Sequence, residues 1–440
     1  MALRRDTICA LASGPPPAAI ATLRVSGPDV RSLISKRLSV SDLKPRHATL
    51  VDLFDESRDV VDSGLAVFMP GPASYTGEDT LEISLHGGRI ITELALKSIM
   101  DAGARLAEPG EFTRRAFEAG KLDLTRAEAV ADLIDAESEA QLAQALKQMG
   151  GALEALYDGW RRDLTKCLAL LEASIDFPDE EDAPERVDAP VRETLSVLQS
   201  DLQRAMEQGN ITERIRDGFK VAILGRPNAG KSTLLNQLAK REAAIVTDIP
   251  GTTRDVIEVR LTLGGYVVWI SDTAGLRETS DIVEAEGVRR AFKTAEEADL
   301  RIWLYDSRDD FDSAHVQPGD LIVANKCDLG GPGNVSRETL QIVAKTGEGV
   351  IALEAKIVDR LMSLTRNVGA PMITRARHRQ GIERAMVHLI QAQDHLQSQT
   401  GAEFVAADVR MASRELGTLT GHIDPDTVLG AVFSSFCIGK

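Results

Sequence analysis

The sequence predicts a multidomain chain with an N-terminal α+β domain, a helical bundle made from two separate segments, and a doubly wound α/β domain inserted between those segments. Three observations predict this. The 440 residues correspond to about three domains at roughly 150 residues each. Hydrophobic residues make up 43% of the chain, enough for several packed cores. The local pattern changes from strands with Gly/Pro turns to Ala/Leu/Glu-rich helix, and then to alternating strands and helices.

The charge of the chain is strongly negative but uneven. The net charge is −16, of which −10 falls in residues 121–216, whereas residues 372–440 are neutral. An acidic surface repels phosphate backbones and anionic membranes. We therefore expect no strong, charge-driven binding of nucleic acid by this chain alone.

The cysteines and the apolar runs exclude several classes of protein. Cys9, Cys167, Cys327 and Cys437 lie far apart and form no CxxC pair, which predicts neither a zinc site nor a disulfide framework. Asp6 and the prolines that follow interrupt the apolar N-terminal stretch, so it does not read as a signal peptide. The cysteine pattern fits the reducing cytoplasm, where we expect this protein. Since no run approaches 18 apolar residues, we expect no membrane span.

Residues 1–120 read as the α+β domain. Strands are expected at 21–25, 64–68 and 80–85, with a helix near 90–100.

Residues 121–216 and 372–440 read as the two parts of the helical bundle. Thr125 followed by Glu128 has the pattern of a capping box. Helix is then expected to about residue 175, with a pause at Gly150 and Gly151, and again over 191–208 after an acidic break at 177–184. After residue 371 the helical pattern returns until about residue 416.

Residues 217–371 read as the inserted doubly wound domain. Strands are expected at 220–224, 266–271, 300–305, 321–324 and 341–344, with helical stretches between them.

The first chemical motif lies after the first of these strands. Residues 225–232, GRPNAGKS, match the phosphate-binding pattern GxxxxGK[ST]. Its glycines let backbone N–H groups turn towards phosphates, Lys231 can reach the β- and γ-phosphate oxygens, and Ser232 can bind Mg²⁺.

Three further motifs follow later strands in the expected order. Asp272 can hold Mg²⁺ through water, and Gly275 can donate its N–H to the γ-phosphate. The Asp328 carboxylate of Asn-Lys-Cys-Asp can accept two N–H donors from guanine but not from adenine, which favours GTP. Ala344 and Lys345 end the last strand, where GTPases place a loop that contacts guanine.

The catalytic group is less obvious. Leu276 directly follows the motif Asp-Thr-Ala-Gly at 272–275. A leucine side chain cannot orient the attacking water, so another group must do so. Asn228, with carbonyl groups from residues 247–253, could bind a monovalent cation that replaces an arginine finger. Glu284 could orient the water, but from the residues alone a solvated helix position is the simpler interpretation.

With these motifs the chain resembles the MnmE (TrmE) family of bacterial tRNA-modification GTPases over essentially its whole length. The resemblance rests on the following segments: 23–27, 70–79, 85–88, 109–113, 121–124, 225–233, 251–255, 272–277 and the C-terminal Phe-Cys-Ile-Gly-Lys at 436–440. It implies an N-terminal domain that binds folate and dimerises, a helical domain, and an inserted Ras-like G domain.

The resemblance also assigns residues in the G domain. The implied GTP-binding residues are Asn228, Ala229, Gly230, Lys231, Ser232, Thr233, Thr247, Asp248, Ile249, Pro250, Gly251, Thr252, Thr253, Asp272, Thr273, Ala274, Gly275, Asn325, Lys326, Asp328, Ala344 and Lys345. Ser232 and Thr253 are the implied Mg²⁺ ligands, and the implied K⁺ ligands are Asn228, Thr247, Ile249 and Thr252. Glu284 matches the catalytic glutamate of the family, and Arg277 lies in the same segment.

For the N-terminal domain, the implied ligand is a tetrahydrofolate derivative, in its 5-formyl or 5,10-methylene form. Its contacts match Arg24, Glu82, Lys121 and Lys440. Cys437 is a catalytic candidate in the family, although a lone cysteine is also compatible with simple packing. One departure is the loop at 13–19, where three prolines replace the usual glycines.

The function that the resemblance implies is modification of tRNA. A homodimer of this GTPase would join an FAD-containing, MnmG (GidA)-like partner in a heterotetramer and build an aminomethyl or carboxymethylaminomethyl group on C5 of the wobble uridine. The alternative is a ribosome-assembly GTPase without one-carbon chemistry. Such proteins usually carry a basic RNA-binding domain, and the only basic cluster here comprises Arg375, Arg377, Arg379 and Arg384, for which a solvated helix face is the simpler interpretation.

Overall fold

The computed structural model describes residues 6–176, 183–241, 257–272, 295–330, 339–366 and 373–421, together with a few positions of the C-terminal segment. Contacts between Cα atoms divide the chain into two units. The first contains residues 1–131, 149–192 and 387–440, and the second contains residues 132–148 and 193–386. Within the described ranges, no helix combines the length and apolar character needed to cross a lipid bilayer.

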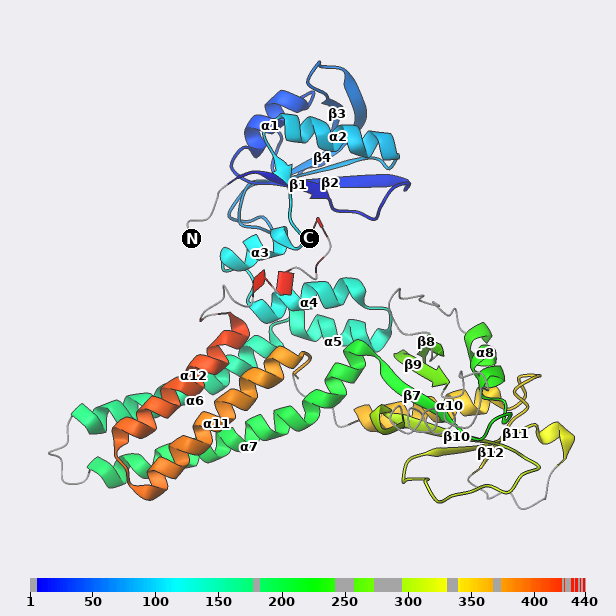
Figure 1. Cartoon of the computed structure of the whole chain (residues 1–440). Coiled ribbons are helices and arrows are strands. Elements are labelled where there is room, and N and C mark those ends of the chain that lie inside the picture. The colour runs from blue at the N-terminus through cyan, green and yellow to red at the C-terminus, as the bar shows by residue number, and fades with distance from the viewer. Residues whose placement is uncertain are drawn as a thin grey trace, which may run out of the picture. The chain divides into compact units, whose positions relative to one another are not determined.

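A six-stranded sheet forms the N-terminal part of the first unit (Figure 1). Its strand order is β3-β4-β5-β2-β1-β6, and its pairings are antiparallel except for the parallel pair β1–β6. The strands are β1 Ile8–Leu11, β2 Ile20–Ser26, β3 Thr49–Phe54, β4 Val60–Met69, β5 Thr80–His86 and β6 Arg105–Leu106. The helices are α1 Val30–Arg37, α2 Arg89–Asp101 and α3 Glu111–Glu118. The predicted α+β class is confirmed.

One face of this sheet carries the core. Leu23 and Val25 of β2, and Leu81 and Ile83 of β5, are fully buried in the same apolar cluster. Because side chains alternate across a strand, the residues between them lie on the other face. Arg24 is therefore on the opposite face, where the register places it directly across from Glu82.

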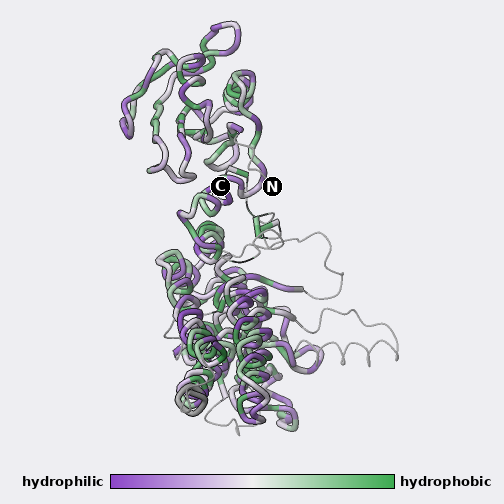
Figure 2. The backbone as a smooth tube through the Cα atoms, turned by 90° about the vertical axis from the view of Figure 1, so that its left-hand side faces the viewer, coloured by the Kyte–Doolittle hydropathy of each residue, from purple (hydrophilic) through white to green (hydrophobic). Residues whose placement is uncertain are grey.

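Helices make up the rest of the first unit. They are α6 Ala152–Asp176 and α12 Ala402–Thr420, together with the larger part of α4 Leu124–Asp135 and parts of α7 and α11. The buried side chains of α6 recur every three or four residues, from Leu153 through Trp160 and Leu164 to Leu171. Figure 2 colours the backbone by hydropathy and shows that hydrophobic and hydrophilic residues are interspersed along the chain. Helix α12 packs against α6, as the predicted helical bundle requires.

The start of α4 corrects the predicted capping box. Asp123, not Thr125, is the capping side chain. Its carboxylate accepts hydrogen bonds from the N–H groups of Thr125 (3.1 Å) and Arg126 (3.0 Å), and from the Thr125 hydroxyl (2.6 Å). A carboxylate one residue before the helix reaches these two donors directly, so the threonine two positions later is already helical.

The helices of the second unit include most of α5 Glu139–Met149 and the part of α7 Ala183–Asp217 that begins at residue 193. The Gln141 amide donates to the Arg216 carbonyl at 2.7 Å, and so ties α5 to the end of α7. Helix α7 is longer than the predicted 191–208 and starts inside the predicted break, at 183. Pro184 is compatible with this start. The N–H groups in the first turn of a helix have no partner within the helix, so a proline there removes no helical hydrogen bond. Helix α11 Ala376–Ser398 belongs partly to each unit.

The second unit also holds the doubly wound domain. Its six strands have the order β12-β11-β10-β7-β9-β8, all parallel except β8, which pairs antiparallel with β9. They are β7 Phe219–Leu224, β8 Ile257–Leu263, β9 Tyr266–Asp272, β10 Leu300–Asp306, β11 Leu321–Asn325 and β12 Leu340–Gln341. The domain also contains helices α8 Lys231–Arg241 and α10 Val350–Thr365 and the short η1 Cys327–Leu329.

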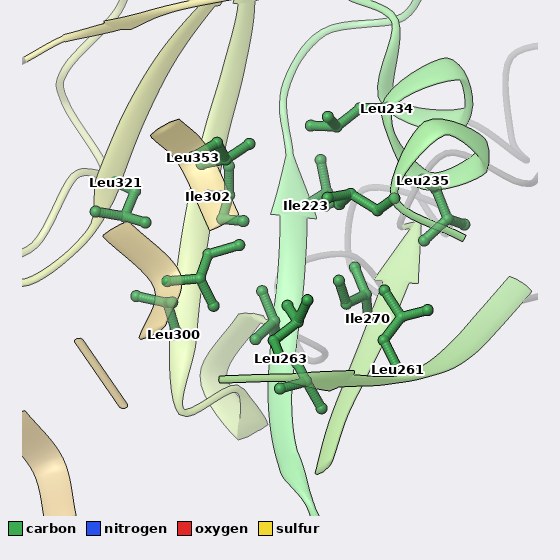
Figure 3. Close-up of a cluster of buried hydrophobic side chains, with 14 of the residues drawn as sticks. Ile223, Leu234, Leu235, Leu261, Leu263, Ile270, Leu300, Ile302, Leu321 and Leu353 are labelled. Carbon is green, nitrogen blue, oxygen red and sulfur yellow. The ribbon is translucent and has the colours of Figure 1, made fainter. Parts of the chain in front are cut away.

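The core of this domain lies between the sheet and helices α8 and α10. Figure 3 shows Ile223 of β7, Ile270 of β9 and Ile302 of β10 on the sheet, with Leu235 of α8 and Leu353 of α10 nearby. The predicted strand 341–344 is shorter than expected, because β12 stops at residue 341. The N–H of Ile342 still donates to Ala324 of β11 at 2.8 Å, but the next residues turn away to form a loop.

The connection from β10 to β11 differs from the predicted alternation of strands and helices. Residues 307–320 are fully described and contain turns but no helix. A parallel connection usually contains a helix that covers the sheet. On that face of β10, Trp303 and Tyr305 are only half-buried, and they border a cavity of about 320 Å³ next to the phosphate-loop residues 225–227.

Candidate functional site

The phosphate loop lies between β7 and α8, at the carboxyl edge of the parallel sheet. Gly225 has a φ of +146°, and a Cβ there would lie 1.9 Å from the Leu304 carbonyl oxygen. Gly230 has a φ of +98°, and a Cβ there would lie 2.2 Å from the amide nitrogen of Asn325. Gly225 is therefore required by the close approach of the β10 backbone, and Gly230 by its positive φ beside the Asn325 side chain.

Lys231 is the buried cation of this loop. It is only 4% exposed, and its ammonium donates to the carbonyls of Gly225 (2.7 Å) and Arg226 (2.8 Å). Lys231 also begins α8, whose first-turn N–H groups carry a partial positive charge. Ser232 and Thr233 follow it and are exposed. Anionic phosphate is the ligand that this combination of an ammonium and a helix N-terminus attracts.

Asn325 joins three predicted motifs. This side chain at the end of β11 is 2% exposed. Its amide donates to the Ala229 carbonyl at 2.7 Å, and its amide oxygen accepts the N–H of Ala344 at 2.9 Å. The phosphate loop and the loop after β12 are thus held by one side chain, which confirms that the structure brings these motifs together.

Lys326 adds a second link to the phosphate loop. Its backbone is left-handed (φ 61°), and its ammonium donates to the Asn228 carbonyl at 2.7 Å and to Asp306 at 2.9 Å. Hydrogen bonds from Arg308 and Lys326 hold the pKa of Asp306 well below its usual range, against the opposing effect of burial. Asp306 was missed by the sequence reasoning, although its place at the end of β10 is the signal that could have found it.

Two of the predicted guanine-binding residues lie in exposed loops at the same edge. Asp328 is in η1 and Lys345 follows Ala344, and both are exposed. Asp272 ends β9 opposite Ile223, so its backbone is at this edge as well. The remaining predicted nucleotide, metal and catalytic residues lie outside the described residues: Thr247, Asp248, Ile249, Pro250, Gly251, Thr252, Thr253, Thr273, Ala274, Gly275, Arg277, Glu284 and Cys437.

A second candidate site lies on the N-terminal sheet. Arg24 of β2 donates through Nε to Oε1 of Glu82 on β5 at 2.9 Å, and its Nη2 forms an ion pair with the same oxygen at 2.8 Å. Its guanidinium also lies 5.9 Å from the ring centre of Tyr75 and 5.7 Å from that of Phe112. The result is a charged pair beside two aromatic rings, a suitable surface for a planar ligand with an anionic tail.

Lys121 lies near this loop but is less closely tied to the pair. Its aliphatic chain would be 3.4 Å from a Cβ on Gly77, two residues after Tyr75. The Tyr75 hydroxyl bonds to the Thr113 hydroxyl at 3.0 Å, and burial raises the pKa of Tyr75. The proline loop is held at its end, where the N–H of Ala18 donates to Gly87 at 3.0 Å.

Gly439, one of the described residues near the C-terminus, lies against the N-terminal domain. Gly439 has a φ of +101°, and a Cβ there would lie 2.1 Å from the carbonyl oxygen of Leu11 on β1. In the β1–β2 register, Leu11 pairs with Leu23 and its neighbour Ala10 pairs with Arg24. The chain end therefore reaches the strand next to the Arg24 pair, although Lys440 itself lies outside the described residues.

An ion-pair network around Glu111 links β6, α3 and the loop before β5 in the N-terminal domain. The sequence alone did not predict it. Glu111 is 1% exposed and accepts hydrogen bonds from Arg105 (2.6 and 2.8 Å) and Arg115 (3.0 Å). Burial opposes its ionisation, but these donors and the Glu108 N–H keep the pKa of Glu111 at about 2. Arg115 also bonds to Glu78 at 2.9 Å, in the loop that carries Tyr75.

The arginines of the basic cluster near residue 380 have partners within the protein. Arg375 pairs with Asp132 at 2.6 Å, and Arg379 pairs with Glu213. Arg377 and Arg384 have partners as well. These contacts do not favour an RNA-binding cluster, but the face is not simply solvated either, because Arg375 and Arg379 are half-buried in ion pairs with Asp132 and Glu213.

The fold and the first site define the class of protein. A phosphate loop between a parallel strand and a helix, joined to an Asn-Lys-x-Asp motif on a sheet with one antiparallel edge strand, is the G domain of a P-loop GTPase.

Comparisons with known proteins identify the family. Residues 7–121 match the family model described as "GTP-binding protein TrmE N-terminus", and residues 124–437 match the one described as "MnmE helical domain". The chain belongs to the MnmE (TrmE) family of tRNA modification GTPases.

Curated relatives match over their full length. The chain is 55% identical over 439 residues to the tRNA modification GTPase MnmE of Hyphomonas neptunium, covering 99% of each chain. It is 47% identical over 440 residues to that of Maricaulis maris, again covering 99% of each. It is also similar to the G domain of the T. maritima FeoB iron transporter, with 26% identity over 32% of this chain and 98% of that one; the TM-score of 0.26 is too low to support a conclusion.

Proposed function

We propose that this GTPase acts with an FAD-containing, MnmG-like partner to build an aminomethyl or carboxymethylaminomethyl group on C5 of the wobble uridine of certain tRNAs. The carbon comes from a tetrahydrofolate derivative and the nitrogen from glycine or ammonium. The observation that carries the proposal is the Arg24–Glu82 pair beside the chain end, in a chain that also holds a complete set of GTPase motifs. The full-length match to tRNA modification GTPases favours this function over ribosome assembly.

The residues of the Arg24 pocket fit the chemistry of a folate. Both contacts of Arg24 go to Oε1 of Glu82, so Oε2 remains to accept N–H donors such as those on a pterin ring. Tyr75 and Phe112 supply aromatic surface, while Arg24 and Lys121 supply positive charge for the glutamate tail of the ligand. In this proposal Lys440 contributes a further cation, and the Cys437 thiol takes part in the one-carbon step.

The G domain residues fit GTP with two metal ions. Ser232 and Thr253 would hold Mg²⁺, and Asn228, Thr247, Ile249 and Thr252 would hold K⁺, because hydroxyl, amide and carbonyl oxygens are the ligands that such hard cations prefer. When bound, the cations neutralise charge that develops on the phosphates. Lys231 holds the phosphates, and Glu284, supported by Arg277, orients the attacking water.

GTP would act by changing the association of two G domains in a homodimer. A ligand shifts a conformational equilibrium only by its difference in affinity for the two states. GTP with K⁺ would bind the closed pair better, and hydrolysis would release it. The heterotetramer with the FAD protein would work in the cytoplasm, where its tRNA substrates are.

The decisive experiment is an analysis of tRNA nucleosides in a strain that lacks this gene. We expect the modified wobble uridine to disappear, to return with the wild-type gene, and to stay absent with Glu284→Ala. An unchanged wobble uridine in the deletion strain would refute the proposed function.

The cation part of the proposal has its own test. GTP turnover should be faster in KCl than in NaCl at equal ionic strength, because the oxygen ligands around Asn228 would select the larger ion. Equal rates in the two salts would remove K⁺ from the mechanism.

The role of Cys437 can be separated from that of GTP. Cys437→Ser should leave GTP turnover intact and abolish modification if the thiol reacts. Normal modification by this variant would reduce Cys437 to a packing residue.

A further inference from the structure

A shallow groove on the first unit is separate from both candidate sites. It runs beside α4 and along the first turns of α6, with a volume of about 500 Å³. Its lining includes three arginines, two carboxylates and a glycine: Arg126, Arg161, Arg162, Glu154, Asp158 and Gly151. Neither the GTPase motifs nor the folate contacts use any of these residues.

The three arginines keep most of their N–H donors available. Arg126 donates through Nε to the Met149 carbonyl at 3.1 Å. Arg161 donates one hydrogen bond to Asp158 at 3.3 Å, and its Nε is buried without a partner. Arg162 donates to the Asp158 carbonyl at 3.2 Å. Each guanidinium therefore has one hydrogen bond among the described residues, and its planar donor fork matches phosphate oxygens.

Two further features favour an anion in this groove. Gly151 and Glu154 lie at the N-terminal end of α6, where the helix carries a partial positive charge. Arg126 and Glu154 form an ion pair at 3.8 Å, which is too long for a hydrogen bond, so this pair does not use up the N–H donors of the Arg126 guanidinium. The side chains of Arg126 and Arg161 are 33% and 28% exposed, so a ligand in solvent can reach them.

We propose that this groove binds the phosphodiester backbone of RNA. The choice of RNA rests on the proposed function, because the substrate of that function is a tRNA. A long polyanion can contact arginines on both α4 and α6 at once, whereas a small anion contacts only part of an open groove. The two carboxylates weaken the site, so binding is salt-sensitive and secondary to that of a more basic partner protein.

The test measures how the affinity of the full-length protein for an unmodified tRNA transcript depends on salt. The double variant R126Q/R162Q should bind less tightly and lower the slope of log K against log [salt] by about one to two, at roughly 0.9 per lost phosphate contact. The control is K166Q on the same helix. Lys166 is 74% exposed and pairs only with Asp163 among the described residues, outside the groove. K166Q should leave the slope nearly unchanged.

Three results would overturn the proposal: a wild-type protein that does not bind the transcript, a slope that R126Q/R162Q leaves unchanged, or an equal loss in K166Q. Displacement of RNA by millimolar inorganic pyrophosphate, abolished by R126Q/R162Q, would instead assign the groove to a small phosphate anion. Circular dichroism of the variants checks that they fold. The nucleoside analysis of the deletion strain tests the proposed function separately, so a groove that fails leaves that function intact.

Discussion

The phosphate-loop edge of the G domain and the Arg24 pocket of the N-terminal sheet are both built on six-stranded sheets, but in different ways. In the G domain the strands are mostly parallel, so short contiguous motifs at their carboxyl ends meet at one edge, and much of the binding surface is backbone. In the N-terminal domain the pocket is a side-chain pair created by antiparallel register between residues 58 positions apart. The G-domain site therefore tolerates little change at Gly225, Gly230 or Asn325. The N-terminal site depends on the strand register that places Arg24 opposite Glu82.

The largest expected effect is at the G-domain edge. Lys231→Ala should lower GTP turnover by on the order of 10³-fold, because it removes the only buried ammonium among the described residues of the loop. Tetrahydrofolate binding should stay unchanged. Steady-state phosphate release and a folate titration measure the two, and a parallel loss of folate affinity would show that the sites are not independent.

The second prediction concerns Glu111, the buried carboxylate of the ion-pair network in the N-terminal domain. Because the pKa of Glu111 is lowered to about 2 in the folded protein, its contribution to stability is complete above pH 4.5 and is lost as the pH falls towards 2. Glu111→Gln should cost about 3 kcal/mol at pH 7 and much less at pH 3.

Calorimetry of both proteins at the two pH values checks this prediction. A difference that does not change with pH would mean that the charge of Glu111 is unimportant. The G-domain transition is the internal control and should not move between wild type and variant.

Asn325→Ala tests how strongly one side chain holds the G-domain edge together. The loss of both hydrogen bonds, with a buried carbonyl and N–H left unpaired, should destabilise this domain by about 2 kcal/mol and weaken GTP binding. Thermal unfolding and nucleotide titration measure it. Asp201→Ala, on the exposed surface of α7, is the control, and similar behaviour of the two variants would exclude a bridging role.

The smallest predicted effect lies in the Arg24 pocket. Arg24→Met keeps much of the side-chain volume but removes the charge, and should weaken tetrahydrofolate binding by about tenfold, the size expected for one charge-assisted contact. GTP turnover should be unaffected. Arg31→Met is a matched control, since Arg31 is an exposed arginine that pairs with Asp79. Unaltered folate affinity in Arg24→Met would remove Arg24 from the site.

Much of the fold could be predicted from the sequence because its signals are local. Strand and helix periodicity located β2, β5 and β7 to within a residue or two. The errors came from features that the periodicity of apolar residues does not encode. Asp123 caps the N-terminus of α4, although it lies outside the predicted capping box of Thr125 and Glu128. The 307–320 connection remains without a helix although its strands are parallel.

What the sequence alone determined is the GTPase chemistry: GRPNAGKS and Asn-Lys-Cys-Asp are contiguous, and their function follows from backbone shape and side chains a few residues apart. What only the tertiary structure decided are contacts between distant residues. Examples are the Asn325 bridge from Ala229 to Ala344, the Arg24–Glu82 pair, the approach of Gly439 to Leu11, and the arginine groove of α4 and α6. The physical reason is that strand register and helix packing, set by burial of the whole core, fix which distant side chains meet.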